Sequence, residues 1–97
     1  MAYVIEFTDD AVRDYRSLEA HLRSTVREAL EIHLRHEPTK VSKSRIKRLR
    51  ELQRPQFRLR TGEIRIYYDV DDKAVTILGI VAKSASADWL ADNPIPS

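Results

Sequence analysis

Residues 57–70, FRLRTGEIRIYYDV, alternate apolar and polar side chains on both sides of a short turn. A period of two is typical of β-strands, in which successive side chains point to opposite faces. Thr61-Gly62-Glu63 supplies the turn, so we predict two antiparallel strands joined as a hairpin. One face of this hairpin faces the core, and the other carries the arginines. The inward set is Phe57, Leu59, Ile64, Ile66, Tyr68 and Val70, and the outward set is Arg58, Arg60, Arg65, Tyr67 and Asp69.

Two further segments extend the predicted sheet. Residues 75–81, VTILGIV, are apolar at nearly every position, which is typical of a central strand covered on both faces. Residues 3–7, YVIEF, form a short run with β-branched and aromatic members, which we interpret as a first strand.

A helical period follows the first strand. Thr8 is a suitable N-cap for a helix that begins near residue 9. Ser24-Thr25 offers a second start, with Glu28 three residues after Thr25, so the stretch is interpreted as two helices in a hairpin. Pro38 ends it near residue 36. The apolar positions at helical spacing are Val12, Tyr15, Leu18, Leu22, Val26, Leu30 and Leu34.

This order of segments predicts an α+β fold. A βααβββ(α) arrangement places a helical hairpin on one face of a small antiparallel sheet, with one short helical turn near residues 84–90. Residues 39–55 are predicted to be a basic connection with at most one helical turn, although Ile46, Leu49 and Leu52 stand at helical offsets. The chain of 97 residues makes one domain, 1–97, in which 91–97 is expected to be a flexible tail.

Positive charge is concentrated in one part of the chain. Residues 40–65 contain ten Lys and Arg against two acids, a local charge of 10 − 2 = +8, whereas the remainder carries 7 − 13 = −6. A clustered positive field attracts phosphate backbones or an acidic protein surface. A solvated basic loop is the simpler interpretation of such a run.

Composition excludes several kinds of site. The chain has no cysteine, so it offers no disulfide, thiolate nucleophile or zinc–thiolate centre. His33 and His36 stand three apart, but without a third ligand nearby we expect solvated histidines and neither a metal nor a cofactor. The stretch MAYVIEFTDD lacks the basic start and apolar run of a signal peptide, and no run approaches about 18 apolar residues. We therefore expect a cytoplasmic protein.

The pattern resembles the RelE/ParE superfamily of bacterial toxin–antitoxin toxins, with the RelE-like branch favoured. The resemblance covers nearly the whole chain and rests on MAYVIEF, LRSTVREAL, RIKRLREL and FRLRTGEIRIYYDVDDKAVTILGIVAK. It implies a type II toxin that inhibits translation by ribosome-dependent cleavage of messenger RNA. Two alternatives stay open: a ParE-like inhibitor of DNA gyrase, and a catalytically impaired homologue that mainly binds its antitoxin.

The resemblance also implies the residues of a catalytic site. It assigns Arg58 and Arg65 to the scissile phosphate and Lys83 to the segment after the last strand. Ser84 stands where an arginine is expected, and Leu90 stands where the family has a tyrosine. The C-terminal catalytic segment is therefore atypical, and whether the chain is an endoribonuclease stays open.

The group that transfers protons is the open part of this site. Arginine stays protonated at physiological pH, so the arginines act electrostatically. Lys83 could transfer a proton only if burial or neighbouring cations weakened its hold on that proton. Glu63, at the turn, and Tyr67, on the outward face, are secondary candidates. The side chains expected to bind RNA phosphates are Lys47, Arg48, Arg50, Arg54 and Arg60.

The aromatic residues have simpler structural interpretations. The alternation of inward and outward positions in residues 64–70 places Tyr68 in the core and leaves Tyr67 exposed. Trp89 could stack on an unpaired base, but we expect it to pin the C-terminal segment to the core.

Partners follow from the resemblance as well. It implies a cognate antitoxin whose acidic or amphipathic segment wraps the basic groove and the helices. The target is messenger RNA in the ribosomal A site, or DNA gyrase under the alternative. Operator DNA is expected to be bound only through the antitoxin complex, and no membrane is expected as a partner.

Overall fold

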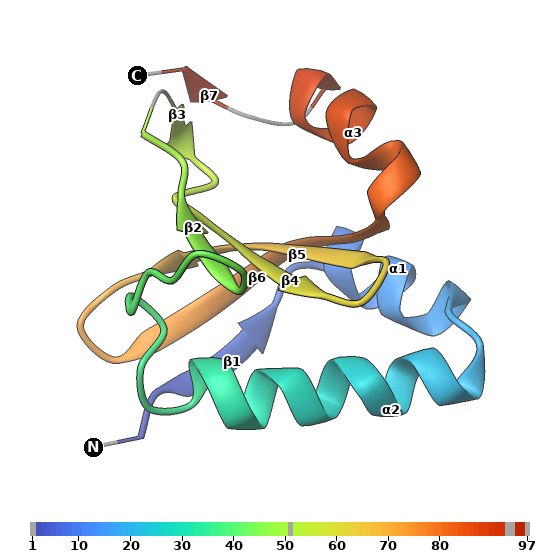
Figure 1. The fold of residues 1–97 in the computed structure, drawn as a ribbon, viewed down its shortest axis with the longest axis horizontal. Coiled ribbons are helices and arrows are strands. Elements are labelled where there is room, and N and C mark those ends of the chain that lie inside the picture. The colour runs from blue at the N-terminus through green and yellow to red at the C-terminus, as the bar shows by residue number, and fades with distance from the viewer. Residues whose placement is uncertain (1, 51, 93–94, 97) are drawn as a thin grey trace.

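The computed structural model describes residues 2–50, 52–92 and 95–96 and has the predicted α+β fold (Figure 1). Helix α2 continues into a π-helical turn, Leu30–Leu34, and a 3₁₀ turn, Lys83–Ala85, precedes α3. The helices are α1 (Asp9–Ser17), α2 (Ala20–Ala29) and α3 (Ser86–Asp92), and the strands are β1 (Val4–Phe7), β2 (Ile46–Arg48), β3 (Leu52–Arg54), β4 (Phe57–Thr61), β5 (Ile64–Val70), β6 (Ala74–Ala82) and β7 (Ile95–Pro96).

The main sheet has five strands in the order β1-β6-β5-β4-β2. Strand β6 is central, as predicted, because it pairs with β1 on one side and β5 on the other. The sheet is mixed: β1 runs parallel to β6, whereas the β6–β5, β5–β4 and β4–β2 pairs are antiparallel. A parallel partner requires a long crossover connection, which the helical hairpin and the following chain supply.

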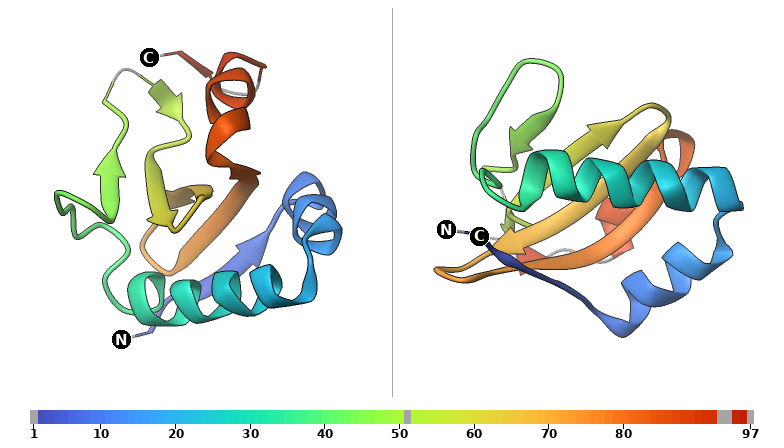
Figure 2. Two further views of the ribbon diagram at one scale, coloured as in Figure 1. Left: turned by 45° about the vertical axis from the view of Figure 1, so that its right-hand side comes forward. Right: turned by 90° about the horizontal axis from the view of Figure 1, so that it is seen from below.

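The helices lie on opposite sides of this sheet. In Figures 1 and 2 the sheet separates α2, along one face, from α3, at the other. The core lies between the sheet and the helical hairpin, where Leu34, Leu59, Ile66, Tyr68 and Ile77 are fully buried. The prediction of which face of the β4–β5 hairpin points to the core is therefore confirmed.

The helical hairpin begins as predicted but divides at a different point. The Thr8 hydroxyl accepts the Ala11 amide at 3.1 Å, and this confirms the first N-cap. The predicted second start at residues 24–25 is wrong, because the chain breaks at Leu18, whose backbone is extended, and α2 begins at Ala20. Thr25 instead lies within α2, where its hydroxyl donates to the His21 carbonyl at 3.0 Å.

The predicted helical turn within residues 39–55 is also wrong. The described part of this segment forms β2, which pairs with β4, and β3, which pairs with β7. Ile46 lies opposite Leu59 and is buried against the core. In this three-residue edge strand only Ile46 is buried, and Arg48 occupies the other inward position, so the sequence shows no apolar period of two.

The last segment is described in part. The predicted helical turn near residues 84–90 is confirmed as α3. The predicted flexible tail, 91–97, lies partly outside the described residues. Within the described part, β7 pairs with β3, and the flexibility of the tail stays a prediction.

Candidate functional site

Four residues on four neighbouring strands lie side by side across the sheet, on the face opposite the helical hairpin. The strand register pairs Lys47 of β2 with Arg58 of β4, Arg58 with Tyr67 of β5, and Tyr67 with Gly79 of β6. Residues directly opposite one another in a sheet share a face. We call these four residues the transverse row. It places two cations and a phenol side by side on neighbouring strands.

A basic hollow opens at the β2 end of the transverse row. It has a volume of about 320 Å³ and is lined by residues 42–47 together with Arg58 and Arg60. Five of these side chains are cationic and none is a carboxylate. Like charges gathered without a counter-charge attract phosphate oxygens. The five cations of the hollow are Lys43, Arg45, Lys47, Arg58 and Arg60.

The loop before β2 gives the hollow its shape. The Ser42 hydroxyl accepts the amides of Arg45 and Ile46 at 3.0 and 3.3 Å, and the Ser42 amide donates to the Ile46 carbonyl at 3.0 Å. The Arg60 amide then donates to the Arg45 carbonyl at 2.8 Å, and the Arg45 guanidinium donates to the Arg60 carbonyl at 3.3 Å. The loop is therefore attached to β4, and it brings Arg45 beside Arg60.

Sequence reasoning did not assign Lys43 and Arg45 to the site. Both were counted in the basic segment, but they precede β2 in a stretch without a recognisable period. The available signal was the pair of serines at 42 and 44, whose hydroxyls favour a tight loop in which neighbouring cations converge.

Two polar atoms of the transverse row are buried without a partner. The Arg58 Nε and the Tyr67 hydroxyl have no hydrogen-bond partner among the described residues. A buried donor that loses its hydrogen bond to water costs about 1–3 kcal/mol, so each such atom requires an explanation, and a catalytic role is one. Arg58 and Tyr67 are direct cross-strand neighbours, so both orphaned atoms belong to one small region of the sheet.

Helix α3 covers the β5–β6 end of the transverse row. The rings of Trp89 and Tyr67 stack with their centroids 4.5 Å apart and their planes 9° apart. A side chain at position 79 would collide with the indole, because a Cβ there would lie 2.4 Å from Trp89 Cζ2. Gly79 therefore lets Trp89 lie directly on the backbone of β6. The prediction that Trp89 pins the C-terminal segment is confirmed.

Two outward residues are buried for different reasons. Arg65 and Tyr67 were predicted to be exposed on the outward face, but they are 5% and 0% exposed. Their predicted exposure is wrong, because Trp89 stacks on Tyr67 and the Arg65 guanidinium folds back onto the β4–β5 turn. The Arg65 guanidinium donates through Nη1 to the carbonyls of Gly62 and Ile64, at 2.9 and 3.1 Å. Arg65 therefore holds the β4–β5 turn.

Lys83 and Glu63 lie at the end of the sheet beside that turn. The Lys83 amide donates to the Glu63 carbonyl at 2.7 Å, so their backbones are in contact. Both side chains are exposed. Lys83 follows Val81 by two residues, and Val81 pairs with Arg65. The structure thus leaves Lys83 accessible to a ligand on the outward face, whereas Tyr67 is covered.

The remaining predicted phosphate-binding side chains are dispersed. Arg48 lies opposite Phe57, with its guanidinium 5.0 Å from the ring centroid, and donates to the Gln56 carbonyl at 3.2 Å. Arg54 pairs with Asp69 at 2.7 Å, and Arg50 is exposed without lining the hollow. Of the predicted set, only Lys47 and Arg60 join Arg58 at the hollow.

The histidines lie apart from any metal-binding arrangement. No group of three or more His, Asp or Glu in the described residues could hold a metal ion. Burial lowers the pKa of His33 below its usual value, and the positive charge of Arg45 lowers it further. Tyr68 is in the core, as predicted: its hydroxyl donates to the Pro38 carbonyl at 2.6 Å, and burial raises its pKa.

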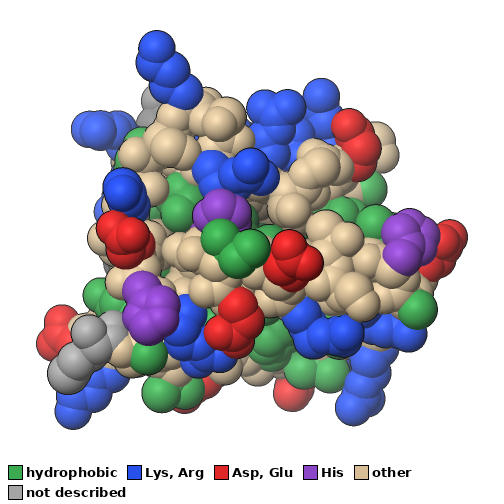
Figure 3. All heavy atoms as spheres, turned by 60° about the horizontal axis from the view of Figure 1, so that its bottom comes forward, with side chains coloured by type: hydrophobic (Ala, Val, Ile, Leu, Met, Phe, Trp, Pro, Cys, Tyr) green, Lys and Arg blue, Asp and Glu red, His purple; other side chains and the backbone are tan. Residues whose placement is uncertain are grey.

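Charges are distributed differently on the face that carries α2. Figure 3 shows Lys, Arg, Asp, Glu and His side chains intermingled there, with hydrophobic side chains between them. The basic hollow differs from this face because its charged side chains are all cationic.

None of the helices in the described part of the chain is long and apolar enough to span a bilayer.

Solved structures similar to this chain identify its family. The chain is 30% identical to the matched chain of the toxin–antitoxin complex RelBE2 from Mycobacterium tuberculosis, with a TM-score of 0.65, and the match covers 84% of this chain and 99% of that one. The chain belongs to the RelE family of toxins. No protein-family model matches it, and no curated protein sequence is significantly similar to it.

More distant RelE structures share the fold. The RelB–RelE complex from Methanococcus jannaschii matches at 18% identity and a TM-score of 0.67, covering 87% of this chain and 96% of that one. A mutant of the E. coli toxin RelE in the free state matches at 23% identity and 0.60, covering 92% of each chain. The predicted RelE-like assignment is confirmed, and the structures named here include no ParE protein.

The two positions that depart from the RelE pattern lie after β6. Ser84 is exposed in the 3₁₀ turn, and Leu90 is half-buried in α3. Successive helix residues point about 100° apart, so Leu90 points away from the direction that Trp89 takes onto Gly79. The indole of Trp89, from α3, contacts the outward face.

Proposed function

We propose that this chain is the toxin of a type II toxin–antitoxin pair and that it inhibits translation by cleaving messenger RNA in the ribosomal A site. The observation that carries the proposal is the basic hollow, in which five cations converge without a carboxylate on a chain of the RelE family. The hollow suits a phosphate backbone, because its positive charge is concentrated in one place. Cations from β2, β4 and the loop before β2 can contact the phosphate oxygens from different sides.

The cleavage chemistry defines what the site must supply. Attack of a ribose 2′-hydroxyl on the adjacent phosphorus forms a 2′,3′-cyclic phosphate and breaks the bond to the 5′-oxygen. The 2′-hydroxyl loses a proton, the departing 5′-oxygen gains one, and negative charge develops on the phosphate oxygens. In the proposed arrangement, Lys47, Arg58 and Arg60 stabilise that charge. Arg65 supports the site by holding the β4–β5 turn.

Proton transfer requires a side chain that can release a proton, which the arginines cannot do at physiological pH. Lys83 is exposed at the end of β6 and is open to substrate. Tyr67 lies beside Arg58 with an unpartnered hydroxyl, but Trp89 covers it. Lys83 is therefore the first candidate while α3 stays in place, and Glu63 and Tyr67 are secondary candidates.

An antitoxin is the proposed protein partner. RelE proteins from Mycobacterium tuberculosis, Methanococcus jannaschii and Pyrococcus horikoshii have been solved in complexes with RelB or as toxin–antitoxin complexes. We propose that an antitoxin likewise binds this chain and blocks the basic hollow. Contact with operator DNA would then come through the antitoxin in the complex.

The test is to induce the chain alone in bacteria and map the 5′ ends of messenger RNA during translation. The test variant is Lys47→Ala/Arg60→Ala, which removes two exposed cations of the hollow. The matched control is Arg16→Ala/Lys73→Ala, which removes two exposed cations that are not among the predicted site residues. Wild type and control should cut within translated codons, and the test variant should cut about a hundredfold less, because two charge-assisted contacts are lost.

Two results would contradict the proposal. Growth arrest with intact transcripts and trapped gyrase complexes would indicate a ParE-like inhibitor. Absence of any growth arrest would indicate that the departures at Ser84 and Leu90 have silenced the site, leaving a homologue that mainly binds its antitoxin. Arg65→Ala is a poor probe of catalysis, since its guanidinium holds the turn.

A further inference from the structure

A second polar depression adjoins the basic hollow at the β2 edge of the sheet. It has a volume of about 270 Å³ and lies between the end of the helical hairpin and β2. Its lining side chains are Ile32, His33, Glu37, Lys40, Ser42, Arg45 and Ile46, and we call it the His33 pocket. Ser42, Arg45 and Ile46 also line the basic hollow. The two spaces therefore share a wall.

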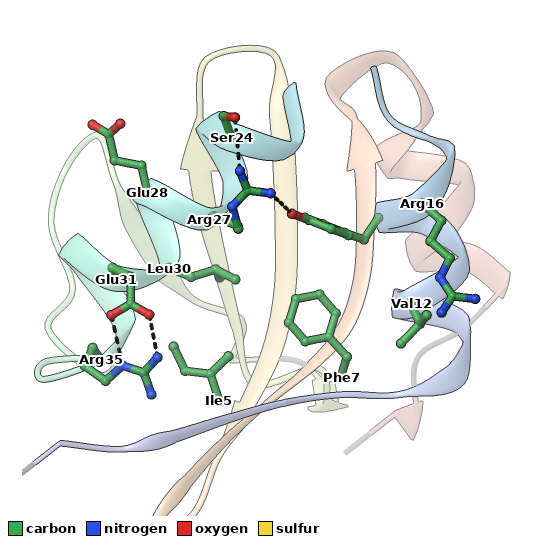
Figure 4. Close-up of a pocket in the computed structure, with 11 residues that line it drawn as sticks. Ile5, Phe7, Val12, Arg16, Ser24, Arg27, Glu28, Leu30, Glu31 and Arg35 are labelled. Atoms are coloured by element: carbon green, nitrogen blue, oxygen red, sulfur yellow. Dashed lines mark hydrogen bonds and ion pairs between the residues drawn. The ribbon is translucent and has the colours of Figure 1, made fainter. Parts of the chain in front are cut away.

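Another cavity of the molecule has no such connection to the basic hollow. It is an apolar groove of about 780 Å³ between β1 and the helical hairpin, and Figure 4 shows Ile5 and Phe7 of β1 pointing across it toward α2. This groove shares no lining residue with the basic hollow or with the His33 pocket. Of these two spaces, only the His33 pocket can extend a ligand site that begins in the hollow.

Arg45 stands on the wall between the hollow and the His33 pocket. The Ser42 hydroxyl accepts the Arg45 amide at 3.0 Å and so fixes the backbone of this wall. The Arg45 guanidinium is exposed and donates to the Arg60 carbonyl at 3.3 Å. A guanidinium carries five N–H donors, so donors remain for a ligand. A group in the hollow and a group in the His33 pocket can thus contact the same side chain.

The charge of the His33 pocket differs from that of the hollow. Burial and the positive charge of Arg45 lower the pKa of His33, so its imidazole is neutral at pH 7. Glu37 and Lys40 lie 3.5 Å apart and offset each other. Among the side chains that line the pocket, Arg45 then leaves a single positive charge, whereas the hollow has five cations and no carboxylate. A phosphate favours the hollow, and the pocket suits an uncharged group.

The side chains of the His33 pocket offer the contacts that a nucleobase requires. A neutral imidazole has one donor and one acceptor, and the ring nitrogens of His33 form no hydrogen bond within the described residues. Unpaired RNA bases stack on histidine rings and guanidinium planes and form hydrogen bonds through their edges. Ile32 adds apolar surface at the rim, where its side chain is 63% exposed. Flat apolar faces with polar edges are thus matched by this lining.

We propose that the His33 pocket binds the base of a nucleotide that flanks the scissile phosphate and thereby gives cleavage a base preference. This inference rests on the proposed function, since it names a second contact with the same RNA. The phosphates lie in the basic hollow, Arg45 contacts the linkage between the two nucleotides, and the base lies against His33 and Ile32. His33 determines specificity and is not a catalytic residue, because the bond that breaks lies at the hollow.

The first experiment compares the cutting sites of two histidine variants. His33→Leu removes the donor and the acceptor, and His36→Leu is the matched control, since His36 is exposed and lines neither space. The 5′ ends of messenger RNA are mapped after induction of each variant. His33→Leu should keep most of the cutting but lose about tenfold of the base preference at one fixed position beside the cut, because one base contact is lost. His36→Leu should keep the wild-type preference, and circular dichroism verifies that both variants fold.

The second experiment uses the wild-type chain and nuclear magnetic resonance. A 2′-O-methyl RNA trinucleotide cannot be cut, since the attacking hydroxyl is blocked. It should shift the ring signals of His33 and the guanidinium signals of Arg60 in the hollow. The rings of His21 and His36 line neither space and should stay unchanged. The same sugar–phosphate backbone without bases should still shift the Arg60 signals but not those of His33.

The outcomes separate this inference from the proposed function. Shifted Arg60 signals with unchanged His33 signals, and equal base preference in both variants, overturn this inference alone. A His33 shift of equal size with the oligomer that lacks bases places a phosphate in the pocket and also overturns it. A His33 shift with the antitoxin but not with the trinucleotide indicates a protein contact and overturns it as well. Arg60 signals that respond to neither oligomer, together with intact transcripts after induction, contradict the proposed function itself.

Discussion

Replacing Gly79 with alanine should displace the indole that covers the transverse row. A Cβ at position 79 would lie 2.4, 2.5 and 2.7 Å from Trp89 Cζ2, Cε2 and Nε1. Carbon atoms in ordinary contact are about 3.5–4.0 Å apart, so the ring must move by about 1 Å or more. The atoms that the new Cβ would meet all belong to the Trp89 side chain. Tyr67, stacked against one face of the indole, blocks displacement of the ring toward that side.

The loss of stability follows from the two contacts that the Trp89 ring makes, with Gly79 and with the Tyr67 ring. Overpacking a well-packed site costs about 1–3 kcal/mol, and full exposure of a large apolar side chain costs a similar amount. We therefore expect Gly79→Ala to lower the free energy of unfolding by about 1–3 kcal/mol. Trp89 is the single tryptophan of the chain, so intrinsic fluorescence reports on this contact alone. Its emission should shift to longer wavelength under native conditions.

A second glycine provides the control. Gly62 has a φ of 57° with nothing within 4 Å of a Cβ built on it, so Gly62→Ala introduces backbone strain of about 1–2 kcal/mol without touching Trp89. It should reduce stability while leaving native emission unchanged. Unchanged emission and stability in Gly79→Ala would refute the reasoning, because the indole would then not rest on the β6 backbone.

Further predictions concern single side chains. Tyr68→Phe should lower the free energy of unfolding by about 1–3 kcal/mol, because the Pro38 carbonyl loses its buried donor, whereas Tyr67→Phe should leave it unchanged or raised, since that hydroxyl has no partner in the described chain; urea titration measures both. Thr8→Ala should cost about 1 kcal/mol by removing the N-cap of α1, again by urea titration, and retention of full stability would contradict the cap. The lowered pKa of His33 in the fold means that the unfolded chain binds more protons, so stability should fall as pH drops below about 6.5. His33→Gln should flatten that part of the profile, and an unchanged slope would contradict the assignment.

The sequence was most informative where one period extends over many residues. The alternation in residues 57–70 predicted both strands, their turn and the inward position of Tyr68. It was least informative at β2, where three residues contain a single buried position, Ile46. There the offsets of Ile46, Leu49 and Leu52 imitated a helix. Pairing with β4, a tertiary interaction, decided the outcome.

Burial of the outward face could not be predicted from the same period. Alternation determines which side of the sheet a residue occupies, but not what covers that side. Arg65 and Tyr67 lie on the predicted face, yet Trp89 of α3 covers Tyr67 and the Arg65 side chain folds onto the β4–β5 turn. Gly79 was the available signal: a glycine within a central strand rich in β-branched residues often marks the close approach of another group, here the ring of Trp89.

The covered and open halves of the outward face imply different roles for the candidate proton-transfer groups. With α3 in place, a ligand can contact Lys47 and Arg60 in the hollow, and Lys83 beyond the end of β6, but not the Tyr67 hydroxyl. An acid–base role for Tyr67 therefore requires α3 to move, whereas a role for Lys83 does not. Because Gly79→Ala displaces the indole, RNA cleavage through Tyr67 should increase in that variant and be lost again when Tyr67→Phe is added. Cleavage through Lys83 should be insensitive to both changes.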